Sequence, residues 1–136
     1  MIPENDLARL KKLARDVSGR AYCRYSDFRV GAVVVAESGD EFAGCNVENA
    51  SYGLSICAER NAVFQMVAGG QRLIKLIVIY TPTQEPAAPC GACRQVINEF
   101  GPLARVVSLC DSNQRLESSI HELLPDSFGP QNLRES

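Results

Sequence analysis

The sequence contains no tryptophan, one histidine and two methionines, and only 7% of its 136 residues are aromatic. It also lacks an excess of basic charge, because 14 lysines and arginines stand against 16 aspartates and glutamates, for a net charge of −2. A basic stripe that would bind duplex phosphates and the stacking-rich loops of polymer-binding proteins are therefore both disfavoured. Long apolar runs are missing too, since a stretch such as residues 33–36 is far below membrane-spanning length.

The N-terminal residues include neither a basic segment nor an apolar one, so no export signal is expected and we predict a cytoplasmic protein. Hydrophobic residues make up 46% of the chain and charged residues 22%, which is enough for one buried core at this length. No repeat or linker interrupts the sequence, and residues 1–136 are expected to form a single domain. Six cysteines in a reducing compartment indicate metal or thiol chemistry before disulfides.

Apolar spacing and turn residues predict alternating helices and strands. A helix is expected over residues 5–18, capped by Asn5 or Asp6 and ended by Gly19. Strands are expected at residues 30–36, 41–47, 73–80 and about 105–109, and helices at residues 58–67 and 91–100, with a helical turn at 120–124. This order predicts an α/β sandwich around a mixed sheet. Right-handed crossovers would place the two later helices on one face, with their N-termini meeting at a ligand-binding edge.

Three cysteines fall at the beginnings of these two helices, Cys57 at the first and Cys90 and Cys93 at the second. Thiolates at helix N-termini are favoured by the backbone dipole, and three of them suit zinc. A structural zinc site normally closes with four protein ligands, but Cys57 has no partner at Cys-x-x-Cys spacing. Three protein ligands leave one position for water, which is the arrangement of a catalytic zinc.

Two charged residues follow Cys57 and complete the predicted site. Glu59 can reach a zinc-bound water as general acid/base but is too close in sequence to bind the metal easily beside Cys57. Arg60 can hydrogen-bond the ligand sulfurs and offset their charge, with a surface salt bridge as its alternative role. Buried thiols or a redox Cys-x-x-Cys pair are the alternatives for the cysteines. The remaining cysteines and the histidine are expected to pack or to lie at a surface: Cys23, Cys45, Cys110 and His121.

The segment Cys57-Ala58-Glu59, followed by Pro89-Cys90-Gly91-Ala92-Cys93, resembles the signature of the zinc nucleoside deaminases. Further matches lie in the same order at residues 25–32, 44–52, 94–95 and 122–125. The resemblance covers residues 25–128 and is strongest to the short cytidine deaminases that have three cysteine ligands and form homotetramers. It implies a three-layer α/β/α sandwich around a mixed five-stranded sheet, Zn²⁺ as the cofactor and a small nucleoside as the substrate.

The resemblance also implies roles for residues outside the metal motif. Asn46 and Glu48 would hydrogen-bond the ribose 3′-hydroxyl, and Phe28 would pack against the nucleoside. The backbone N–H of Ala58 would hold the base O2, and Phe128 resembles an aromatic residue that a neighbouring subunit places over the base. The alternatives are a solvated strand-end charge for Glu48 and ordinary core or interface packing for the two phenylalanines.

These observations predict hydrolytic deamination of cytidine and 2′-deoxycytidine to uridine and 2′-deoxyuridine, with release of ammonia, in pyrimidine salvage. Glu59 would carry a proton from the attacking water to N3 and then to the departing amino group. A deaminase of another aminopyrimidine nucleoside, or of an antibiotic such as blasticidin S, is the alternative enzyme, and a noncatalytic zinc-binding module is the alternative outside enzymes. Tyr25 and Tyr52 are expected to be structural or intersubunit residues.

Overall fold

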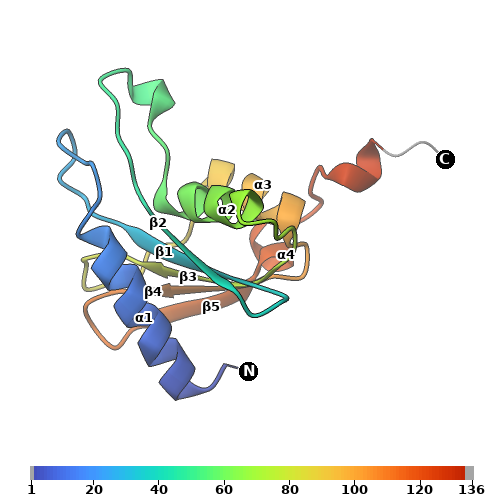
Figure 1. The fold of residues 1–136 in the computed structure, drawn as a ribbon, viewed down its shortest axis with the longest axis horizontal. Helices are drawn as coiled ribbons and strands as arrows, with labels where there is room; N and C mark the ends of the chain where they lie inside the picture. The colour runs from blue at the N-terminus through green and yellow to red at the C-terminus, as the bar shows by residue number, and fades with distance from the viewer. Residues whose placement is uncertain (1, 134–136) are drawn as a thin grey trace.

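The computed structural model describes residues 2–133, so that Met1 and residues 134–136 of the expected single domain lie outside the described part. Its centre is one sheet in the order β2-β1-β3-β4-β5 (Figure 1). The strands are β1 (Gly31–Ala36), β2 (Glu41–Cys45), β3 (Ile74–Tyr80), β4 (Arg105–Leu109) and β5 (Arg115–Ser119). Only β3 and β4 pair in parallel, whereas the other neighbouring strands are antiparallel.

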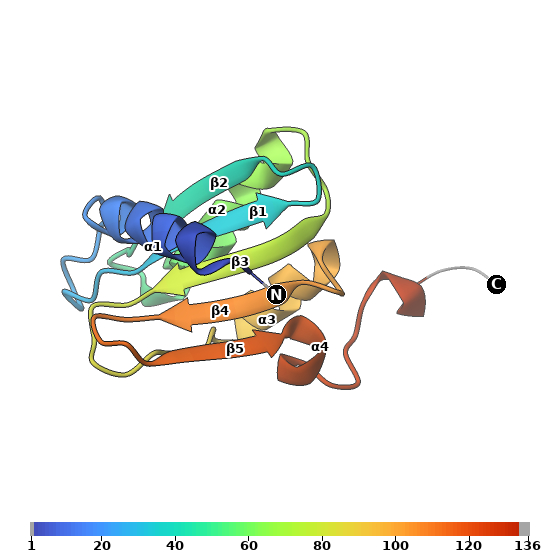
Figure 2. The same ribbon diagram turned by 90° about the horizontal axis from the view of Figure 1, so that it is seen from below.

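Helices cover both faces of this sheet. Helix α1 (Glu4–Ser18) lies on one face, whereas α2 (Ala58–Ala68), α3 (Gly91–Phe100) and the short α4 (Ile120–Leu123) lie on the other (Figures 1 and 2). In β3, Leu76 and Val78 pack with α1, and Ile77 and Ile79 pack with α2 and α3. A strand buried on both faces is almost wholly apolar for this reason. The predicted three-layer sandwich around a mixed five-stranded sheet is confirmed.

Two glycines allow these helices to approach the sheet closely. A Cβ atom on Gly31 would lie 1.8 Å from the backbone oxygen of Ala14 in α1. A Cβ atom on Gly44 would lie 2.4 Å from the backbone nitrogen of Ala62 in α2. No side chain fits at either contact, so each helix rests directly on strand backbone. The N-terminus of α2, where Cys57 lies, is thereby held against the sheet.

Two local features differ from the predictions. Strand β5 was not predicted, because its sequence, Arg-Leu-Glu-Ser-Ser, has little β preference and no apolar alternation. It is an edge strand that pairs with β4 and stays largely exposed, so pairing rather than burial defines it. Helix α1 begins at Glu4 behind Pro3 and has no side-chain cap, so the predicted cap at Asn5 or Asp6 is wrong.

Beyond α4 the chain forms an arm, residues 126–133, that extends away from the sheet (Figures 1 and 2). It contains the short 3-10 helix η2 (Pro130–Asn132). The side chain of Gln95 in α3 donates a hydrogen bond of 2.8 Å to the backbone oxygen of Phe128 and ties the arm to the body. None of the helices in residues 2–133 combines the length and the apolar character needed to cross a membrane.

Candidate functional site

The fold brings the three predicted metal ligands together at the N-termini of α2 and α3. Cys57 and Cys90 are the N-cap residues of these helices, and Cys93 lies in the first turn of α3. Their three Sγ atoms all lie within 4.8 Å of one another, although Cys57 is far from the other two in sequence. The convergence follows from the topology, because both crossovers return to the same face and edge of the sheet.

The donor set fits zinc. Zinc–sulfur bonds of about 2.3 Å in tetrahedral geometry place two sulfur ligands about 3.8 Å apart. The Sγ atoms of Cys57 and Cys90 lie 3.8 Å apart. A redox pair needs only two thiols, whereas three lie together here, and Cys93 is the most buried of them. The cluster is therefore a metal site.

Arg60 lies beside this cluster. Its Nη2 donates a hydrogen bond of 3.6 Å to the Sγ of Cys57, and its Nε is buried without a partner within the described residues. A buried unpartnered donor is costly unless nearby negative charge compensates it, and a group of thiolates supplies that charge. The hydrogen bond from Cys93, followed by that from Arg60, lowers the pKa of the Cys57 thiol to about 5. The thiolate form of Cys57 is thus favoured at neutral pH, whereas the same hydrogen bond raises the pKa of the Cys93 thiol that donates it.

Glu59 is a buried carboxyl group next to the thiols. It lies in the first turn of α2 with only 6% of its surface exposed, and it lines a cavity of about 260 Å³ together with Cys57 and Cys90. Burial raises the pKa of Glu59 to about 7. A carboxyl group with a pKa near neutrality can both accept and donate a proton, as a general acid/base must. Ala58 lines the same cavity, and its amide belongs to the first helical turn, where amides have no partner within the helix.

Asn46 and Phe28 also line the cavity. The Oδ1 of Asn46 accepts a hydrogen bond from the Val30 amide, and its Nδ2 donates one to the Phe28 carbonyl, both at 2.8 Å. Asn46 therefore joins the end of β2 to the segment that leads into β1. One N–H and one lone pair of its side-chain amide remain for a ligand.

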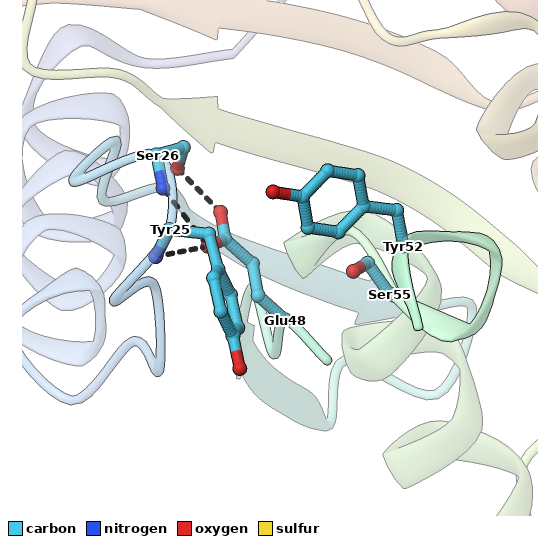
Figure 3. Close-up of a pocket in the computed structure, with 5 residues that line it drawn as sticks. All are labelled: Tyr25, Ser26, Glu48, Tyr52 and Ser55. Carbon is cyan, nitrogen blue, oxygen red and sulfur yellow. Dashed lines mark hydrogen bonds between the residues drawn. The ribbon is translucent and has the colours of Figure 1, made fainter. Parts of the chain in front are cut away.

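Glu48 also lines this cavity, and the segment that contains Tyr25 and Ser26 holds its carboxylate (Figure 3 shows these contacts). Its Oε1 accepts hydrogen bonds of 3.1 Å from the amides of Tyr25 and Ser26, and its Oε2 accepts one from the Ser26 hydroxyl. The Ser26 hydroxyl lowers the pKa of Glu48 below its ordinary value. Glu48 is thus an ionised hydrogen-bond acceptor rather than a freely solvated strand-end charge.

Phe128 is the one predicted contact that the single chain does not bring to the cavity. It lies on the C-terminal arm with 59% of its surface exposed, and its role in a neighbouring subunit's site stays a prediction. His121 is exposed on α4 and is not part of the cysteine cluster. Of the other cysteines, Cys23 and Cys110 are buried and Cys45 is half-buried.

Several residues that line the cavity were not singled out from the sequence: Ser26, Val30, Ile79, Thr81, Ala87 and Ala88. Ser26 and Val30 had a usable signal, because both lie within the matched segment at residues 25–32. Ile79 and Thr81 are at the end of a core strand, and the two alanines belong to a proline-rich loop. Nothing in their residue types indicates a ligand cavity.

Replacing one metal ligand tests the cluster directly. Cys90→Ala should lose zinc and lower the melting temperature, because metal binding is coupled to folding. Zinc per chain, measured by atomic emission, should fall from about one to well below half. Cys45→Ala, in a half-buried cysteine outside the cluster, should retain the metal. Full zinc occupancy in Cys90→Ala would show that the ligands are wrongly assigned.

Comparison with known proteins agrees with this geometry. The model of the "cytidine and deoxycytidylate deaminase zinc-binding region" matches residues 4–110. A cytidine deaminase of Sporosarcina psychrophila is 39% identical over 129 residues, which cover 94% of this chain and 95% of that protein. The crystal structure of cytidine deaminase from Burkholderia pseudomallei has a TM-score of 0.85 and 45% identity, covering 89% of this chain and 98% of that one. The chain therefore belongs to the zinc-dependent cytidine and deoxycytidylate deaminase family.

Proposed function

We propose that the chain catalyses the zinc-dependent hydrolytic deamination of cytidine and 2′-deoxycytidine to uridine and 2′-deoxyuridine, with release of ammonia. The observation that carries the proposal is a buried carboxyl group, Glu59, beside three cysteine sulfurs at one end of a cavity. Other residues that line the same cavity, Asn46 and Glu48 among them, offer polar side chains that can hold a ribose. Relatives at about 40% identity named cytidine deaminase support the same reaction.

The chemistry divides between the metal and the residues around it. Zinc held by three thiolates supplies a Lewis acid that lets water act as a nucleophile at neutral pH. Glu59 takes a proton from the attacking water at its carboxylate and delivers it to N3 of the cytosine ring. It then takes the remaining proton from the oxygen added at C4 and passes it to the amino group, so that the C4–N bond breaks, C4 becomes a carbonyl and ammonia leaves. Arg60 offsets part of the negative charge of the thiolates through its hydrogen bond to Cys57.

Other residues hold the nucleoside in place for this reaction. The amide of Ala58 binds the base O2, and the ring of Phe28 packs against the nucleoside. Asn46 and Glu48 bind the ribose 3′-hydroxyl, using the hydrogen-bonding capacity that their contacts within the chain leave free. Their positions around one cavity support these assignments.

The charge of the cavity favours a nucleoside over a nucleotide. The name of the family model includes deoxycytidylate, which has a phosphate group. Among the described residues, those lining the cavity include the carboxyl groups of Glu48 and Glu59 but no lysine, arginine or histidine. A phosphate dianion there would lose hydration and face like charge without gaining a cation.

The enzyme should therefore discriminate strongly between 2′-deoxycytidine and deoxycytidylate. We expect kcat/KM for deoxycytidylate to be about 100-fold or more below kcat/KM for 2′-deoxycytidine. The loss of cytosine absorbance measures both rates. The two substrates differ only by the phosphate, so each is the control for the other. Equal efficiencies would contradict the assignment of a nucleoside substrate.

Glu59→Gln separates metal binding from proton transfer. The amide keeps the size of the side chain but cannot take up and release the proton, so kcat should fall by about 10²–10⁴-fold. Zinc per chain should stay unchanged. Glu99→Gln, at an exposed position in α3, is the matched control and should retain full activity. Undiminished deamination by Glu59→Gln would refute the mechanism. If the chain were a noncatalytic zinc-binding module instead, the unaltered chain would also show no turnover.

We further propose that the enzyme is a homotetramer in which Phe128 of one subunit covers the base bound by another. An exposed aromatic residue on an arm that extends from the body supports this arrangement. A domain of this size also has little wall with which to close a nucleoside cavity by itself. A cytoplasmic location and a role in pyrimidine salvage belong to the same proposal, supported by metal-binding thiols that must stay reduced.

Phe128→Ala tests this contact. KM for cytidine should rise about tenfold with a smaller change in kcat, because the ring contributes to binding rather than to proton transfer. Leu133→Ala, at another exposed apolar position on the arm, should leave KM unchanged. Mixed oligomers of Phe128→Ala and Glu59→Gln chains should regain part of the low KM, since the second chain supplies an intact Phe128 to its neighbour. An unchanged KM in Phe128→Ala would leave the residue a packing contact only.

A further inference from the structure

The hydroxyl group of Ser26 connects two of the proposed substrate contacts. It donates a hydrogen bond to Oε2 of Glu48 and accepts one of 3.0 Å from the amide of Phe28 (Figure 3 shows the bond to Glu48). Because an amide can only donate, the Ser26 oxygen is the acceptor in the second bond, and its single proton is free for the carboxylate. The direction of both bonds is therefore determined.

The hydrogen bonds at Glu48 leave room for one more donor. A carboxylate has about four acceptor positions, and three are occupied by the Tyr25 amide, the Ser26 amide and the Ser26 hydroxyl. Both amides bind Oε1, so the remaining position lies on Oε2, the atom that Ser26 orients. An ionised carboxylate cannot donate, so a ligand at this position must offer a donor such as a hydroxyl group.

The same hydroxyl stabilises an uncommon turn. Asp27, between Ser26 and Phe28, has a φ angle of 56°, in the left-handed region that residues other than glycine seldom adopt. The hydrogen bond from the Phe28 amide to the Ser26 hydroxyl spans this residue. The Asp27 amide donates a second bond, of 2.7 Å, to the Cys23 carbonyl and does not depend on Ser26. Loss of the hydroxyl would therefore loosen the turn without removing all of its anchors.

We propose that Ser26 is a positioning residue that orients the Glu48 carboxylate toward the ribose 3′-hydroxyl and thereby sets the selectivity for nucleosides that have this group. The inference rests on the proposed function, because the contact between Glu48 and the ribose is part of it. Ser26 lies on a different segment from Glu59 and the thiols, so it acts on substrate binding rather than on the chemical step.

A cycle that combines a substitution with a substrate change tests this role. Ser26→Ala should raise KM for cytidine about tenfold and change kcat by less than about twofold. With 3′-deoxycytidine, which differs from cytidine only by the missing 3′-hydroxyl, the variant and the unaltered enzyme should have the same KM. The preference for cytidine over 3′-deoxycytidine should thus fall about tenfold.

Matched variants separate the hydroxyl from the turn. Ser26→Thr keeps the hydroxyl and should retain the selectivity, whereas Ser26→Val, which has nearly the shape of threonine, should lose it. Ser38 provides the local control, because its hydroxyl also accepts a bond from the amide two residues later, Asp40, at 3.3 Å. That turn joins β1 to β2 and includes no carboxylate bound to the serine hydroxyl. Ser38→Ala should leave both KM values unchanged.

The outcomes separate this inference from the function on which it rests. An equal rise in KM for both nucleosides would mean that Ser26 only supports the loop, and would overturn the positioning role alone. Zinc-loaded, unaltered enzyme that fails to deaminate cytidine would overturn the proposed function and this inference with it. Melting temperature and zinc per chain show which variants are folded. If Ser26→Ala is not folded, equal selectivity in the threonine and valine variants would overturn the role.

Discussion

The site depends on the meeting of two helix N-termini at one edge of the sheet. Strand β1 lies between β2 and β3, so α2 crosses over it, and α3 then makes the next crossover on the same face. The two helix dipoles favour the thiolates that gather there. Once Cys57 begins α2, the first turn of that helix also places Glu59 and Arg60 beside the sulfurs. Metal binding, charge compensation and proton transfer are thus set by one packing arrangement.

Another part of the cavity wall is built differently. No regular element runs through residues 25–30, and this segment is held by amides that donate to the side chains of Asn46 and Glu48 and by a carbonyl that accepts from Asn46. The half-buried side chains of Asn46 and Glu48 thus fix a segment that has no regular backbone pairing of its own. The cysteine cluster is therefore positioned by helix packing, whereas the residues proposed to bind the sugar are positioned by a polar network that follows a strand.

Much of this arrangement could be predicted from the sequence, because it depends on local patterns. Apolar spacing located α2, α3 and the core strands, and the cysteine positions indicated the metal site. The burial of Glu59 could not be derived in the same way, because it depends on segments packed from elsewhere in the chain. Ser26 was missed because its partner Glu48 is 22 residues away and a left-handed residue lies between Ser26 and Phe28. Strand β5 was missed because backbone pairing defines it.

Helix α3 has a consequence that reaches beyond the cavity. Cys90 is the N-cap of this ten-residue helix, and Cys93 lies in its first turn. The side chain of Gln95 in the same helix donates a hydrogen bond to the carbonyl of Phe128. The one helix that brings two of the three cysteines to the site therefore also anchors the C-terminal arm to the body of the chain.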